Sequence, residues 1–224
     1  MVRKTKEDTE QTYTALLDAA ERVFKDKGVA AATLNDIAGA AGMTRGAIYW
    51  HFKDKADLFR AMCDRATLPL EANFERADVD ARIDPLGTLR SLSIAALASL
   101  ASDPRAQNVF EIVFHKSEMV DELAGLATTH RLERSACLCQ IEDVIRRAAA
   151  AGQLPADIDA ALATQGLHAM MVGIMHEWVL DPQAYDLAAA APALVDMFLA
   201  GLESNPPRVR RVGEPEVARL VEAS

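Results

Sequence analysis

The chain has 224 residues, of which 50% are apolar, 25% charged and 5% aromatic, so it is long enough to bury a sizeable core. Its net charge of −9 is uneven, because residues 1–65 carry 11 basic against 10 acidic side chains and residues 66–224 carry 13 against 23. Alanine-rich stretches without alternating β-branched residues predict an all-α fold, and the three cysteines match neither a disulfide framework nor paired zinc ligands.

The first residues of the chain are basic and polar, with Arg3, Lys4 and Lys6 and no apolar run behind them. This pattern does not match a secretion signal, and with the unpatterned cysteines it predicts a reducing cytoplasmic location. The basic arm can reach phosphates or a minor groove, or it can serve as a solubilising tail. The residues leave both interpretations open.

Two helices are predicted within residues 8–41. The first runs from Asp8 to Gly28, where the apolar stripe ends. The second begins after Thr33, because a hydroxyl followed three residues later by the acidic side chain of Asp36 is typical of a capping box at a helix N-terminus. A left-handed turn at Gly42 then leads into a third short helix, which is helix-turn-helix spacing. The inward-facing residues of the unit are Leu16, Leu17, Ala20, Val23, Phe24, Leu34, Ile37, Ala38, Ala41, Met43 and Ile48.

The third helix carries the side chains that can read DNA. Thr44 caps its N-terminus, Arg45 follows where a guanidinium can bond guanine, and Gly46 allows close approach of the backbone. Ile48 and Phe52 share a face and are expected to be core, whereas Trp50 is equally consistent with a core or a DNA-facing position. Tyr49 can offer its hydroxyl to a phosphate or its ring to a thymine methyl, and His51 and Lys55 are placed to contact phosphates. Asp54 with Asp57 forms another capping signal that puts Lys55 in a first helical turn, although Lys53 and Lys55 can also be merely exposed.

These residues also resemble a known family. The stretch from Thr33 to Phe59, with Thr-Leu-Asn-Asp-Ile-Ala, Thr-Arg-Gly-Ala-Ile-Tyr-Trp-His-Phe and Lys-Ala-Asp-Leu-Phe, resembles the DNA-binding signature of the TetR family of transcriptional regulators. With Asp84-Pro85-Leu86-Gly87 and Gly152-Gln153-Leu154-Pro155, the chain is most similar to the AcrR-type branch, which represses multidrug efflux pumps. We therefore assign double-stranded DNA contacts to Arg3, Lys4, Thr33, Thr44, Arg45, Gly46, Tyr49, Trp50, His51 and Lys55.

We expect about nine helices in two domains, a helix-turn-helix domain over residues 1–55 and a ligand-binding and dimerisation bundle over 56–204. The tail over 205–224 contains prolines and arginines but few large apolar groups, which predicts that it is flexible. In the bundle, Asp84-Pro85 and Asp103-Pro104 predict two helix starts. Further helices are expected over 118–152, from Asp157 to Asp181, and up to Leu202 with Pro192 in the first turn. The one that joins the domains continues through Leu58, Met62 and Ala66.

The last two helices have small and apolar residues on more than one face, among them Ala169, Gly173, Ala193 and Met197. This distribution predicts a four-helix interface between two copies with two-fold symmetry, which the family resemblance also implies. In the alternative, both faces are buried within one chain.

The most apolar run of the bundle extends from Leu167 to Leu180. It contains His168, His176 and Glu177 and is shorter than the roughly 20 residues of a membrane span, so no membrane association is expected.

A small apolar or aromatic effector is expected in the bundle, with His115 and Glu177 as further polar contacts. Each lining residue is individually consistent with plain core, but flexible methionines and two aromatic rings one turn apart can adapt to varied ligands. By linkage, an effector that prefers badly spaced recognition helices weakens DNA binding. We assign the effector site to Leu92, Phe110, Phe114, Cys137, Ile141, Met171, Val172 and Met175.

Other functions are less consistent with the residues. Metal-ligand spacing is missing among His115, His130, His168 and His176, and there is no phosphate loop or nucleophile turn, so we expect neither an enzyme nor a cofactor. A redox sensor at Cys137 and Cys139 is disfavoured because residues two apart on a helix diverge. A regulator of a metabolic operon, or an activator, stays an open alternative.

Overall fold

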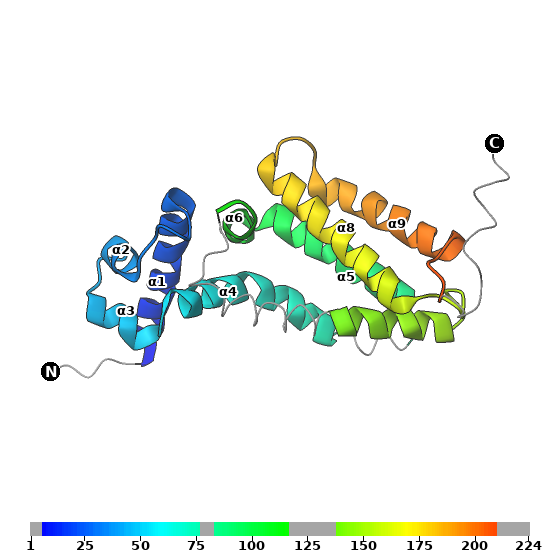
Figure 1. The fold of residues 1–224 in the computed structure, drawn as a ribbon, viewed down its shortest axis with the longest axis horizontal. Helices are drawn as coiled ribbons and strands as arrows, with labels where there is room; N and C mark the ends of the chain where they lie inside the picture. Colours follow the sequence, from blue (N-terminus) through cyan, green and yellow to red (C-terminus); the bar gives the residue numbers. More distant parts are fainter. Residues whose placement is uncertain (1–5, 77–82, 117–137, 210–224) are drawn as a thin grey trace, which may run out of the picture.

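The computed structural model describes residues 6–76, 83–116 and 138–209, and this part of the chain is helical, as the sequence predicts (Figure 1). Beyond the named helices, residues 138–150 form a further helical stretch. The elements are α1 (Lys6–Lys27), α2 (Leu34–Ala40), α3 (Arg45–His51), α4 (Lys55–Arg76), α5 (Pro85–Ser102), α6 (Pro104–Glu111), the π-helical turn η2 (Ile112–Lys116), α8 (Ala160–Leu180) and α9 (Leu187–Ser204).

The first three helices form one small core, and its turns are those the sequence indicates. Gly28 ends α1 with φ +78° and Gly42 makes the turn between α2 and α3 with φ +67°, a left-handed conformation that favours glycine. Side chains from all three helices are buried together, including Leu16, Ile37 and Ile48, each with no exposed surface. This core holds α3 on the surface of the domain, at the end of the molecule farthest from α9 (Figure 1).

The long helix α4 joins this domain to the body. Leu58 and Met62 are fully buried in the N-terminal core, so the first part of α4 packs with that domain, beyond the boundary predicted at residue 55. Val109 of α6 and Ile112 of η2 enter the same core from the body. The two parts are therefore connected by packing as well as by the chain.

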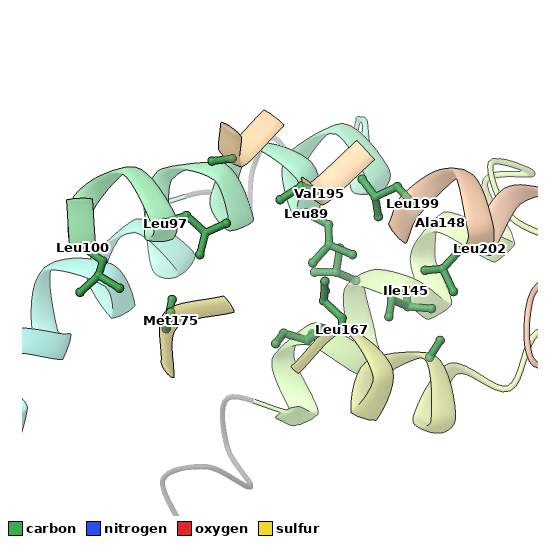
Figure 2. Packing of buried hydrophobic residues seen from close by; sticks show 14 of the residues in the cluster. Leu89, Leu97, Leu100, Ile145, Ala148, Leu167, Met175, Val195, Leu199 and Leu202 are labelled. Atoms are coloured by element: carbon green, nitrogen blue, oxygen red, sulfur yellow. The ribbon is translucent and has the colours of Figure 1, made fainter. Parts of the chain in front are cut away.

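The body is a helical bundle built mainly on the pairing of α5 with α9. Figure 2 shows its apolar core, to which α5, residues 138–150, α8 and α9 all contribute. Asp84 and Asp103 cap α5 and α6 through the amides of Gly87 and Arg105, which confirms the two predicted helix starts. The labelled core residues are Leu89, Leu97, Leu100, Ile145, Ala148, Leu167, Met175, Val195, Leu199 and Leu202.

Two helix boundaries differ from the prediction. Asp159 rather than Asp157 caps α8, because the backbone carbonyl of Asp157 accepts from Val209 N and its carboxylate pairs with Arg208. The last helix begins at Leu187, where Asp186 accepts from Ala189 N, so Pro192 lies inside α9 instead of in its first turn. An aspartate outside the predicted span therefore decides where this helix starts.

The flexible tail predicted from residue 205 is wrong for its first five residues. Pro206 is buried, and Ile158 and Arg208 form an isolated antiparallel bridge. Asp159 N donates to the carbonyl of Pro207 at 2.7 Å. Residues 205–209 thus pack against residues 157–159, beside the start of α8.

By length and hydropathy alone, helix α9 could cross a membrane, and less than a third of its residues are buried inside the molecule. Its buried side faces the bundle through Leu187, Ala191, Val195, Leu199 and Leu202. The opposite side is exposed, with Met197 at 68%. Exposed apolar surface along one side of a helix is typical of a contact site.

Candidate nucleic-acid interface and effector site

Helix α3 is held by its cap and by one buried side chain. The hydroxyl of Thr44 accepts from Ala47 N at 3.3 Å, which satisfies an amide that the helix leaves open. Ile48 is fully buried, and Phe52, just after the helix, is 2% exposed. Both are core residues, as predicted, whereas Arg45, Gly46, Tyr49 and Trp50 are exposed.

The outward face of α3 presents the side chains expected to read DNA. Tyr49 is 47% exposed and Trp50 72%, which decides for Trp50 against the core. The guanidinium of Arg45 lies 5.4 Å from the centre of the Tyr49 ring, one turn away on the same face. With exposed Gly46 beside them, these residues form a cationic and aromatic surface without bulky cover, suited to a duplex groove.

Thr33 positions the neighbouring helix. Its hydroxyl and its amide both donate to Asp36 Oδ2, at 2.8 and 3.0 Å, and the hydroxyl accepts from Asp36 N, so the predicted capping box is confirmed. Lys27 Nζ lies 2.8 Å from Asp36 Oδ1. Hydrogen bonds from Lys27 and then Thr33 lower the pKa of Asp36 to about 2. A phosphate contact by the Thr33 hydroxyl, which stays a prediction, would require its hydrogen to turn away from Asp36 Oδ2, while its oxygen can still accept from Asp36 N.

Lys55 holds backbone in this structure. Its ammonium donates to the carbonyl oxygens of Ala30 and Ala32, at 3.1 and 3.2 Å, and so ties the start of α4 to the turn before α2. The cap of α4 differs slightly from the predicted box, because Asp57 accepts from Lys53 N rather than from Asp54 N. The phosphate contact assigned to Lys55 is therefore still a prediction.

Sequence reasoning missed Tyr13 on α1. Its ring stacks on Phe52 at 5.1 Å and lies 5.9 Å from the ring of His51, which in turn meets Trp50 edge-on at 4.6 Å. Burial, and then the charges of Asp64 and Asp57, raise the pKa of Tyr13. Tyr13 therefore supports the C-terminal end of α3. The signal was present, because Tyr13 extends the apolar stripe of α1 by one turn.

The predicted effector residues gather partly on α6, η2 and α8. Phe110 and Phe114 lie 5.5 Å apart, and Phe114 meets the His176 ring at 5.4 Å. His115 lies 4.6 Å from the same ring, and its buried Nε2 has no hydrogen-bond partner among the residues that the structure describes. We call Phe110, Phe114, His115 and His176 the aromatic cluster. It combines apolar surface with a polar atom that a ligand can satisfy.

The other assigned residues have ordinary positions. Ile141 and Met175 are buried in the body core, and Met171 packs against it. Leu92 and Val172 are half-buried on α5 and α8. Arg3, Lys4 and Cys137 lie outside the described residues.

Comparison with known proteins gives consistent matches over both parts of the chain. Residues 16–62 match the model of bacterial regulatory proteins of the tetR family, and residues 84–204 match the C-terminal region of MAATS-type transcriptional repressors. The transcriptional regulator AcrR of Shigella flexneri is 36% identical, over 89% of this chain and 93% of that protein.

Solved structures agree with this match. NalD, the secondary repressor of the MexAB-OprM multidrug efflux pump in Pseudomonas aeruginosa, superposes with a TM-score of 0.80 at 34% identity, covering 89% of this chain and all of that one. The complex of triclosan with SmeT, a repressor from Stenotrophomonas maltophilia, gives a TM-score of 0.76 at 33% identity, covering 92% and 98%.

Proposed function

This chain belongs to the TetR family of transcriptional regulators, and from that membership we propose that it represses a multidrug efflux operon until an apolar or aromatic effector releases it. The similar NalD represses a multidrug efflux pump, and the similar SmeT forms a complex with triclosan. A regulator that acts on DNA functions in the cytoplasm, and the proposal needs neither catalysis nor a cofactor.

The observation that carries the proposal is the outer face of α3. Arg45 and Tyr49 share that face, and exposed Trp50 adjoins it. We assign base contacts to Arg45, since a guanidinium at a helix N-terminus can bond guanine O6 and N7 in the major groove. We assign backbone or thymine-methyl contacts to Tyr49 and Trp50, with Thr44, Gly46 and His51 beside them.

We further propose that the protein binds as a homodimer through α8 and α9. Exposed small or apolar residues lie seven and then four residues apart on α8, at Leu162, Ala169 and Gly173, and four apart on α9, at Ala189, Ala193, Met197 and Gly201. Side chains this small let helices of a second copy approach closely. Two copies would read two half-sites separated by a whole number of DNA turns, so the operator would be palindromic.

The effector is proposed to enter at the aromatic cluster. The buried, unsatisfied Nε2 of His115 supports a ligand that brings a polar group into an otherwise apolar site. A hundredfold release of operator corresponds to about 2.7 kcal/mol of differential affinity, which one filled pocket can supply.

A gel-shift titration with duplex DNA from upstream of the protein's own gene tests the proposal, with triclosan as first effector. Arg45→Ala is expected to keep weak, salt-sensitive binding but to lose preference for this duplex over a scrambled one, by about 1–3 kcal/mol. Lys53→Ala, which removes an exposed cation near α3, serves as the control and should retain the preference. A monomeric wild-type protein that binds no duplex at low salt would contradict the proposal.

A further inference from the structure

A set of charged and polar contacts fastens α1 to the segment α6–η2 of the body. Lys25 Nζ lies 2.8 Å from both Asn108 Oδ1 and Glu111 Oε2. Val29 N, just after α1, donates to the carbonyl of Lys116 at 3.0 Å. None of these groups belongs to the proposed DNA surface or to the proposed effector site.

A shared pair of carboxylates makes a third point of contact. Arg65 of α4 pairs with Asp18 at 2.8 Å and with Glu21, whose side chain is 10% exposed. Arg105 of α6 reaches the same two carboxylates, at 3.4 Å from Asp18 and 3.9 Å from Glu21. Two guanidinium groups from different helices thus hold one face of α1, and guanidinium geometry is rigid and directional.

These contacts, which we call the α1–α6 joint, are spread along α1. From Asp18 to Lys25 the helix rises about 10 Å at 1.5 Å per residue, and Val29 follows just after the end of α1. Contacts at several separated points restrict rotation and tilting of α1 relative to the body. If the N-terminal domain were attached through α4 alone, a single helix would have to fix its orientation. The joint therefore sets the direction in which the body presents α3.

We infer that Lys25 and Arg105 are positioning residues for operator binding, which act by orienting the DNA-binding domain on the body. The inference rests on the proposed function, because orientation matters only if two α3 helices read half-sites at a fixed separation. The same segment faces α8 on its other side, where Phe114 and His115 meet His176. The element that orients the DNA-binding domain therefore also borders the proposed effector site.

The double variant Lys25→Gln/Arg105→Gln tests this role. It removes the Lys25 contacts and the Arg105 contacts while Val109 and Ile112 still pack into the N-terminal core, so the domains stay joined. Arg146→Gln/Arg147→Gln is the matched control, because it also removes two cations from exposed ion pairs, here within residues 138–150. Melting temperatures verify that all variants are folded.

The readout is discrimination between half-site spacings. The probe is the shortest duplex protected by the wild-type protein, with and without one base pair inserted between its half-sites, which rotates one half-site by about 35°. The double variant is expected to lose about tenfold in discrimination and to keep its affinity for a scrambled duplex within about twofold. The control variant should match wild type. If the two residues had a merely structural role, the affinity for the protected duplex and the affinity for the scrambled duplex would fall together.

Two outcomes of the spacing experiment overturn the inference: the double variant discriminates between the half-site spacings as well as wild type does, or the control variant loses as much discrimination as the double variant. Amide hydrogen exchange at Val29 gives a second test without DNA, since a loosened joint should speed it about tenfold and unchanged exchange contradicts the inference. Wild-type protein that protects no duplex contradicts the proposed function instead. Lys25→Glu alone should reduce discrimination, and Lys25→Glu/Glu111→Lys should restore most of it.

Discussion

At the scale of single residues, polar side chains near α3 divide into those that hold backbone and those that face solvent. Thr33 and Lys55 hold backbone, the first through a capping box and the second through two carbonyl oxygens. Arg45 and Trp50 face outward. Substitutions in the first group should change the position of the helices, and substitutions in the second should change contacts with DNA.

Asp36 provides a titration that tests the first group. Its pKa of about 2 results from the hydrogen bonds of Lys27 and Thr33, so we expect Lys27→Met to raise it toward 3.8, as measured by NMR of the side-chain carboxyl. A lowered pKa means that folding favours the carboxylate. The contact therefore stabilises the protein above pH ~4 and is lost as the pH falls through about 2. A pKa that stays near 2 in Lys27→Met would show that Thr33 alone is sufficient.

At the scale of the elements, the helix ends decide where each recognition residue stands. The turn between α2 and α3 depends on Gly42, which has φ +67° and nothing within 4 Å of where a Cβ would lie. Its role is therefore conformational and does not involve close packing. Gly39, three residues earlier inside α2, has equal space around it and no positive φ.

This pair of glycines allows a matched test. Gly42→Ala should lower the free energy of unfolding by about 1–2 kcal/mol, because a Cβ in the left-handed region clashes with the following carbonyl oxygen. Gly39→Ala should raise it by about 0.5–1 kcal/mol, since alanine loses less backbone entropy in a helix. Urea denaturation followed by circular dichroism measures both. Equal effects of the two substitutions would remove the conformational argument.

At the scale of the whole molecule, the DNA-reading end and the outer face of α9 lie at opposite ends of one chain (Figure 1). The proposed dimer would join copies through α8 and α9, and the α1–α6 joint would transmit the resulting spacing to α3. Neither the dimer interface nor the α1–α6 joint would by itself fix the separation of the two α3 helices. In this proposal, sequence-specific affinity would depend on both, because a dimer gains affinity from a second half-site only if that half-site lies within reach.

Met197→Glu tests the dimer, since it places a charge at the centre of the exposed stripe of α9. We expect sedimentation velocity to give a monomer and operator affinity to fall about a hundredfold, as the two half-sites are no longer linked. Gln140→Glu, at an exposed position on residues 138–150, is the control and should leave the protein dimeric. A Met197→Glu protein that remains a dimer would place the interface elsewhere.

Local signals in the sequence determined most of the fold and the core of the candidate site. The capping residues Thr33, Thr44, Asp84 and Asp103 act within three positions of the amides they bond, so adjacent residues suffice to predict those helix starts. The exposed face of α3 likewise follows from the burial of Ile48 and Phe52. Trp50 stayed undecided because its neighbours permit either orientation.

Tertiary structure alone decided the contacts between residues distant in the chain. Lys55 bonds carbonyl oxygens 23 and 25 residues earlier, and Lys25 meets Asn108 across 83 residues. Asp157 pairs with Arg208 across 51 residues and thereby moves the start of α8. Periodicity and capping report on one helical turn, whereas these bonds depend on how whole helices pack. The orientation of the DNA-binding domain on the body is for that reason a property of the packed molecule.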